Sequence, residues 1–354
     1  MRIGVRSYLL GVAAAALISN AQQGPPGASK WIPVKTLRPI PTKTIDIVHG
    51  GPTSIKIRPP NLNAIQFAGD FTGWAVGSDG FTLRSTDGGT TWVDSVLRTP
   101  YWLMAVHFPT SRDGWAVGFG ARGIVFATHD GGRKWDEATG FDSKDRSSFE
   151  DVWFADARHG WLAGWMELDE TEQGVLLATD DGGRRWKLRY SGGVQGEYLN
   201  KVRFADPLHG WAVGQNTIIR TEDGGRNWRE QARDLGPEDS LAVHVISATE
   251  AWIVGSRVLR TTNGGVSWNS VGLPREGSRR LLTGVHFATP KCGWIAGDGV
   301  VYATADNGEH WIREKLGVGR YVRGLFATST AVFAVTDDGI ILRRERDCPV
   351  TQAR

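Results

Sequence analysis

The sequence predicts an all-β protein, a seven-bladed β-propeller with four-stranded blades. Three observations support this fold class. A "GWAVG"-like segment recurs along the chain, an "S/T-x-D-x-G-x-x-W" segment follows it in six units, and no unit shows the 3.6-residue apolar period of a helix. Units of about 40 to 50 residues with short strands and Gly-rich turns are typical of propeller blades.

An aromatic pair marks the first two strands of each blade. The second-strand aromatics lie 39 to 50 residues apart and are Trp74, Trp115, Trp161, Trp211, Trp252, Trp294 and Phe333. Seven residues before each lies an apolar anchor, namely Phe67, Phe108, Phe154, Phe204, Val245, Phe287 and Phe326. The constant offset predicts a strand, a tight turn and a second strand in all seven units.

A hairpin of the Asp-box type is expected between the third and fourth strands, as in "TEDGGRNW" (Thr221–Trp228). The Asp can accept hydrogen bonds from backbone N–H groups two or so residues further on, the glycines permit positive φ, and the Trp packs between sheets. The corresponding residues are Asp87, Asp130, Asp181, Asp223, Asn263 and Asp306. One acid per blade cannot converge on one substrate, and Asn263 replaces the acid once, so we interpret the set as structural rather than catalytic or calcium-binding.

The seventh unit has no Asp-box and no fourth strand of its own. Another segment must complete that blade, because an open sheet edge favours aggregation. The favoured candidate is Ser29–Thr36, which contains Trp31 and is similar to the fourth strands, and the alternative is Ser54–Pro60. Either segment would close the ring by joining the two ends of the chain.

The N-terminus has the pattern of a secretory signal. Arg2 and Arg6 form a basic start, Tyr8–Ile18 is a short apolar core, and small residues suit cleavage after Ala21. The apolar core is too short for a membrane-spanning helix. We therefore expect a signal peptide over residues 1–21, a single propeller domain over residues 22–354, and export to the periplasm, a lumen or the extracellular space.

Charge and cysteine content limit the partners and the cross-links. The chain has 41 Lys and Arg against 38 Asp and Glu, so it lacks the basic footprint of a nucleic-acid-binding protein. We expect no nucleic acid, no cofactor and a monomer.

Cys292 and Cys348 are the two cysteines, and both map to the Asp-box face of neighbouring blades. An exported protein permits a disulfide between them, and two free thiols are the alternative.

The repeat also resembles a known family. "FADPLHGWAVG" (Phe204–Gly214) followed by "IIRTEDGGRNW" (Ile218–Trp228) is similar to the photosystem II stability and assembly factor family of BNR/Asp-box propellers. The resemblance covers roughly residues 30 to 345. It implies a non-enzymatic factor that binds a protein or peptide, such as a subunit of a membrane complex, during assembly.

Binding is expected on the face opposite the Asp-boxes, where the loops differ between blades. Arginine and aromatic side chains are the types that anchor protein interfaces. The candidate binding residues around this face are Tyr101, Trp102, Arg122, Arg146, Trp165, Tyr198, Arg257, Arg280, Arg320 and Tyr321.

The enzymatic alternative is a secreted BNR-repeat glycoside hydrolase or carbohydrate-binding propeller. Its acids would come from the blade-three loop "WMELDETEQG" (Trp165–Gly174), which carries Glu167, Asp169, Glu170 and Glu172. Arg58 alone echoes a sialidase motif, so we assign no catalytic residue.

His107, His244 and His286 occupy one equivalent position on three first strands, and we interpret them as hydrogen-bonded core residues rather than metal ligands.

Overall fold

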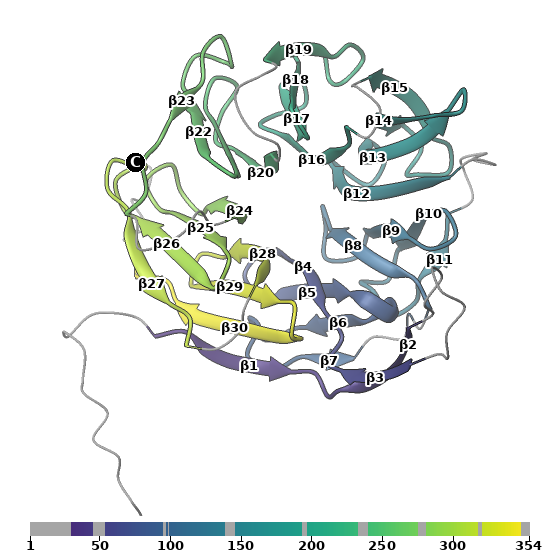
Figure 1. Ribbon diagram of the computed structural model, residues 1–354, viewed down its shortest axis with the longest axis vertical. Coiled ribbons are helices and arrows are strands. Elements are labelled where there is room, and N and C mark those ends of the chain that lie inside the picture. Colours follow the sequence, from purple (N-terminus) through teal and green to yellow (C-terminus); the bar gives the residue numbers. More distant parts are fainter. Residues whose placement is uncertain are drawn as a thin grey trace, which may run out of the picture.

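The computed structural model describes residues 30–44, 54–94, 97, 99–138, 146–192, 197–232, 240–274, 281–317 and 321–347. The expected signal peptide lies outside these residues. They form seven four-stranded antiparallel sheets arranged as a ring around a central channel (Figure 1). The predicted all-β, seven-bladed architecture is confirmed. No helix in the described ranges is long and apolar enough to cross a membrane.

Each blade runs from an inner to an outer strand. Blade one has β4 (Leu62–Ala68), β5 (Thr72–Gly77), β6 (Thr82–Ser85) and β7 (Val93–Asp94), with η1 (Ser78–Gly80) between β5 and β6. Blade two has β8 (Trp102–His107), β9 (Gly114–Phe119), β10 (Gly123–Thr128) and β11 (Asp136–Glu137). Blade three has β12 (Ser147–Phe154), β13 (Gly160–Leu168), β14 (Thr171–Thr179) and β15 (Lys187–Gly192).

The next three blades repeat this order. Blade four has β16 (Leu199–Phe204), β17 (Gly210–Gly214), β18 (Thr217–Thr221) and β19 (Arg229–Ala232). Blade five has β20 (Ser240–Val245), β21 (Ala251–Gly255), β22 (Val258–Thr261) and β23 (Asn269–Ser270). Blade six has β24 (Leu282–Phe287), β25 (Gly293–Gly297), β26 (Val300–Thr304) and β27 (Ile312–Lys315).

Blade seven combines both ends of the chain. Its inner strands are β28 (Val322–Ala327), β29 (Ala331–Thr336) and β30 (Ile340–Glu345), and its outer strand is β1 (Ile32–Thr36). β1 pairs antiparallel with β30, with Ile32 opposite Arg343 (Figure 1). The other N-terminal segment, β3 (Ser54–Arg58), pairs instead with β2 (Ile40–Thr44) in a separate two-stranded sheet.

The repeated aromatics join neighbouring blades. Trp74 of β5 stacks on Phe108 of blade two, with ring centroids 3.5 Å apart and planes 4° apart, and its Nε1 donates to the Gly131 carbonyl at 3.0 Å. Phe108 meets Trp135, the last residue of the blade-two hairpin motif, edge to face at 86°. The second-strand aromatic therefore packs on the next blade, because that is where its large apolar surface is removed from water.

A glycine of the hairpin makes room for this contact. Gly132 has φ +82°, and a Cβ on it would lie 2.9 Å from Trp74 Nε1. Gly89 has φ +76°, and its Cβ would lie 2.4 Å from the ring of Phe333, the blade-seven equivalent of Trp74. Both the backbone conformation and the ring of the preceding blade thus require glycine.

The hairpin acids organise the turn through hydrogen bonds. The Asp223 carboxylate accepts from the backbone N–H groups of Arg226 at 3.0 Å and Asn227 at 2.9 Å, three and four residues further on rather than two. Thr221 Oγ1 donates to Asp223 at 2.9 Å and accepts from Gly225 N–H. Although partial burial opposes it, these bonds lower the pKa of Asp223 to about 2.

The equivalent amide in blade five performs the same task without a charge. Asn263 Oδ1 accepts from the Ser267 backbone N–H at 3.0 Å, and its Nδ2 donates to Ser267 Oγ at 2.9 Å. We therefore expect Asp223→Asn to change the free energy of unfolding by less than about 0.5 kcal/mol at pH 7, whereas Asp223→Ala costs about 1–3 kcal/mol because two turn N–H groups lose their acceptor. Urea unfolding of both variants measures this, and equal losses would contradict the hydrogen-bonding role.

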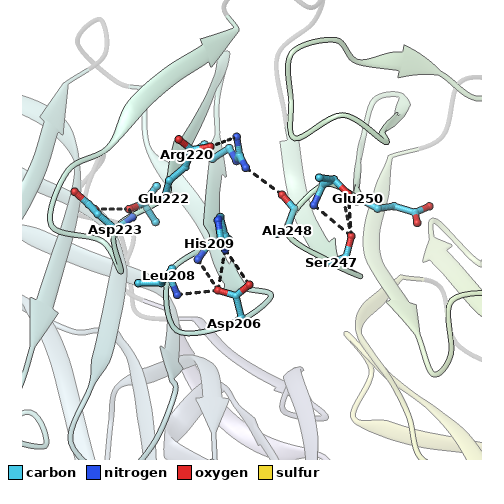
Figure 2. Close-up of polar contacts among 11 residues, drawn as sticks. Asp206, Leu208, His209, Arg220, Glu222, Asp223, Ser247, Ala248 and Glu250 are labelled. Atoms are coloured by element: carbon cyan, nitrogen blue, oxygen red, sulfur yellow. Dashed lines mark hydrogen bonds and ion pairs between the residues drawn. The ribbon is translucent and has the colours of Figure 1, made fainter. Parts of the chain in front are cut away.

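Polar side chains on the hairpin face also cross between blades. Arg220 of β18 pairs with Glu222 at 2.7 Å and donates to the Ala248 carbonyl of blade five at 3.0 Å (Figure 2). Its guanidinium also lies 5.0 Å from the centroid of the Trp211 ring. The Gly224 N–H donates to Leu208 O in the turn between β16 and β17. The first and third turns of a blade therefore lie together on one face, and the second turns and the inter-blade links lie on the other.

Blade seven departs from the repeat in its first turn. Phe326 pairs with Phe333, whereas in blade one it is Gln66, one residue before the anchor Phe67, that pairs with Trp74. Ala327 thus takes the anchor position, and Phe326 lines the central channel. The expectation that Phe326 is the anchor is wrong, because the connection between β28 and β29 is one residue shorter than in the other blades.

The seam between blades six and seven uses the N-terminal segment. Trp31, which is 4% exposed, lies in one apolar cluster with Trp294 and Cys292 of blade six. Its Nε1 donates to Glu314 Oε2 at 2.8 Å, and Glu314 also pairs with the buried Arg344 of β30. Cys292 is buried and disulfide-bonded. Its expected partner Cys348 lies outside the described residues, so the pairing stays a prediction.

Candidate functional site

Three of the expected binding residues meet on blade three, on the face opposite the hairpins. The Trp165 and Tyr198 rings lie 5.4 Å apart, and the Arg146 guanidinium lies 5.8 Å from the centroid of the Trp165 ring. Glu172 connects them, because it accepts from the Tyr198 hydroxyl at 2.8 Å and pairs with Arg146 at 3.4 Å. We call Arg146, Trp165, Glu172 and Tyr198 the blade-three cluster.

The electrostatics of the cluster hold its aromatic groups in place. Partial burial, the hydrogen bond to Glu172 and the charge of Glu172 raise the pKa of Tyr198, so its hydroxyl stays protonated and donates. Arg146 remains largely exposed, with 71% of its side chain accessible. A cation beside the Trp165 ring and still open to solvent is suited to contact an acidic or aromatic group of a partner.

A pocket of about 340 Å³ opens beside the cluster. Its lining residues come from blades two and three and are Phe119, Gly120, Ala121, Arg146, Ser147, Ser148, Glu150 and Trp165. Trp102 packs against Phe119 with ring centroids 5.9 Å apart, and the Tyr101 ring lies against Gly120. Tyr101 and Trp102 therefore support the blade-two wall of this pocket.

The remaining expected residues lie apart from the cluster. Arg122 is exposed and comes within 3.9 Å of Glu137 at the outer strand of blade two. Arg257 follows β21 in blade five, and Tyr321, 48% exposed, precedes β28 and bridges to Asp298. Arg280 and Arg320 lie outside the described residues. In the described part of the chain, the expected binding residues that lie together are those on blades two and three.

The central channel carries a second group of polar residues, which the binding-site prediction did not include. Asp151 is 1% exposed and accepts from the Val202 backbone N–H at 3.0 Å, while Lys201 lies 3.3 Å away and Arg203 pairs with it directly. Burial alone would raise the pKa of Asp151, but Arg203, Lys201 and the Val202 N–H together lower it, so the carboxylate is charged. The signal that could have found Arg203 is its position directly before the anchor Phe204.

The three channel histidines are half-buried and neutral. His107 Nδ1 accepts from the Phe154 backbone N–H at 3.1 Å, and His286 is hydrogen-bonded to the Ala327 backbone. Burial, with the Arg203 charge adding to it, lowers the pKa of His107 to about 3 and that of His286 to about 4, and lowers that of His244 well below its usual value. No group of three His, Cys, Asp or Glu residues in the described ranges is arranged to hold a metal ion.

Fold and site together define a class of protein: a seven-bladed β-propeller scaffold with a rigid repeat face and an arginine–aromatic surface on the opposite face. Residues 193–312, which span blades four to six, match the family model described as photosynthesis system II assembly factor YCF48. This match confirms, over blades four to six, the resemblance to the Ycf48 family that the repeats indicated.

Individual relatives are distant. A photosystem II assembly lipoprotein Ycf48 from Synechococcus sp. (strain CC9902) is 32% identical over 117 residues, which are 31% of this chain and 34% of that protein. The chain thus matches about a third of the length of this curated relative. A solved structure described as YCF48 bound to D1 peptide has a TM-score of 0.66 at 19% identity and covers 90% of this chain and 97% of its own. YCF48 from Cyanidioschyzon merolae has a TM-score of 0.62 at 20% identity, with 89% and 98% covered.

Proposed function

We propose that this protein is an exported, non-enzymatic factor that binds a protein or peptide and assists the assembly of a membrane complex. The observation that carries the proposal is the blade-three cluster beside its open pocket, on a chain whose blades four to six match the model of an assembly-factor family. Exposed arginine next to packed aromatic rings is the residue chemistry of interface hot spots. The bound partner is a segment with acidic and aromatic side chains, since Arg146 offers the cation and Trp165 the ring.

The contacts of Glu172 weigh against the carbohydrate-active alternative. A glycosidase needs two carboxylates that face the scissile bond, one to donate a proton and one to act as base or nucleophile. Glu172 instead accepts from Tyr198 and pairs with Arg146, which fixes both of its oxygens within the cluster. Hydrolysis of a polysaccharide by the purified chain, abolished by Glu172→Gln, would replace the proposal.

Site-directed cross-linking tests the binding surface. A benzoylphenylalanine at position 165 is expected to cross-link one partner in native envelope, whereas the same group at position 266 captures none, because Val266 is 85% exposed but lies on the hairpin face. The sharpest variant is Arg146→Glu, which we expect to reduce the position-165 cross-link at least about tenfold. Arg226→Glu, an equal charge change in an exposed arginine of the hairpin face, is the control. A partner captured only from position 266 would overturn the assignment of the face.

A further inference from the structure

The central channel contains a chamber built from equivalent positions of the seven inner strands. The cavity has a volume of about 260 Å³. The register of each inner strand against its neighbour identifies the residue that pairs with the second-strand aromatic. These seven residues all line the cavity, and we call them the channel floor: Gln66, His107, Trp153, Arg203, His244, His286 and Phe326.

The positions two steps closer to the opening are mostly small. At these positions, each inner strand has one residue that pairs with the second strand of its own blade and also lines the cavity. The residues are Ala64, Ala105, Asp151, Lys201, Ala242, Gly284 and Gly324. Inner strands begin at the face opposite the hairpins, so this layer lies between the floor and that face. Five of its seven side chains end at Cβ or have none, which leaves the space above the floor open.

The floor combines flat rings with a single charge. The ring centroids of Trp153 and His107 are 5.8 Å apart. The His286 ring centroid lies 4.9 Å from that of His244 and 4.5 Å from that of Phe326. Arg203 is the charged member of the floor, and 31% of its side chain is accessible. Its charge acts on all three histidines, which places the guanidinium within electrostatic reach of blades two, five and six.

Cations exceed anions in the chamber. Lys201 and Arg203 share one carboxylate, that of Asp151, and the exposed Arg323 lines the cavity on the side of the opening. A surplus of positive charge in a concave site with low-dielectric walls attracts an anion. A guanidinium among flat uncharged rings matches a carboxylate, because its planar donors fit two oxygens while the rings contact an organic body.

We propose that the central chamber is a binding site for a carboxylate with a small organic body, held by Arg203 and Lys201 over the ring-lined floor. Two sources carry this chemistry: a free organic acid, or an acidic side chain of a peptide that enters from the face opposite the hairpins. The second source rests on the proposed function, and the first does not. The site is separate from the blade-three cluster and uses different residues.

The test uses the full chain, one free acid and a matched pair of peptides. 4-Fluorobenzoate is titrated by ¹⁹F NMR, and the peptides acetyl-Ala-Asp-Ala-amide and acetyl-Ala-Asn-Ala-amide are titrated by calorimetry. We expect fluorobenzoate to bind with a Kd of about 1 mM or lower. Binding of the Asp but not the Asn peptide identifies the peptide source, and binding of fluorobenzoate alone identifies the free acid. In protein labelled with ¹⁵N-histidine, binding shifts the resonances of His107, His244 and His286.

Matched variants decide whether the chamber is responsible. We expect Arg323→Glu to weaken fluorobenzoate binding at least about tenfold and Lys201→Gln at least about threefold. The control Arg226→Glu, on the hairpin face, should change the Kd less than about twofold. Arg146→Glu should also leave it unchanged, which separates failure of this site from failure of the blade-three site. No binding by any probe, preference for inorganic phosphate over fluorobenzoate, or equal weakening by Arg226→Glu would overturn the proposal.

Discussion

A chain that begins at Leu37, and so lacks β1, is expected to lose its cooperative thermal unfolding transition. The strand completes blade seven by pairing with β30, and Trp31 fills the seam against Trp294. A buried Trp removes about 150–250 Å² from water, worth about 4–6 kcal/mol at 25 cal/mol per Å². That is a large part of the 5–15 kcal/mol that stabilises a typical domain, and the exposed edge of β30 adds a tendency to aggregate.

The closing strand also supports a buried charge. Trp31 Nε1 donates to Glu314, the carboxylate that pairs with Arg344, which is 3% exposed. Removing the strand leaves this pair open to water on one side. Differential scanning calorimetry and light scattering of chains that begin at Lys30 and at Leu37 make the comparison. The Lys30 chain should melt like the full chain, and an unchanged transition in the Leu37 chain would show that β1 does not close the ring.

The free energy of unfolding is expected to fall steeply between pH 6.5 and 4.5. His107, His244 and His286 are held neutral in the folded protein because their pKa values lie below 6.5, at about 3 for His107 and about 4 for His286. In the unfolded chain they take up protons below about pH 6.5. The unfolded state therefore binds more protons, and stability that is fully present above pH 6.5 is lost as the pH falls towards the folded pKa values.

The size of the effect follows from three coupled protonations. Each adds up to about 1.4 kcal/mol per pH unit, so the three approach about 4 kcal/mol per pH unit near pH 5. The hairpin acids contribute at lower pH, since Asp223 and Asp306 have pKa values of about 2. Urea unfolding at half-unit steps of pH gives the slope directly.

Blade one supplies the matched variant for this measurement. Gln66 Oε1 accepts from the Phe108 backbone N–H at 2.8 Å, as His107 Nδ1 accepts from Phe154. His107→Gln should therefore keep the hydrogen bond and reduce the pH slope by about a third. His129→Gln, which changes a histidine that is 68% exposed, should leave the slope nearly unchanged. A slope that does not respond to His107→Gln would show that the channel histidines are not its cause.

The repeat by itself determined the blade count, the role of the second-strand aromatics and the form of the hairpins. Each of these depends on residues close together in sequence: Trp74 pairs with Gln66 eight residues earlier, and Asp223 bonds to groups three and four residues further on. Contacts between residues this close in the chain recur wherever the same short sequence recurs, so the repeat predicts them. The one local feature that misled was Phe326, because a turn shorter by one residue shifts the register without changing the seven-residue offset.

Only the tertiary structure decided what the loops bring together. Which N-terminal segment pairs with β30 depends on contacts between chain ends some 300 residues apart, and no local pattern distinguishes Ser29–Thr36 from Ser54–Pro60 beyond resemblance. Arg146, Trp165 and Tyr198 meet because β13 and β14 extend to nine residues each and carry Glu172 to the link before blade four. Arg203 lies in the channel with six equivalent residues because the inner strands pair with the second strands in the same way in all seven blades. Such convergence is set by packing between blades, which the order of residues along one blade does not encode.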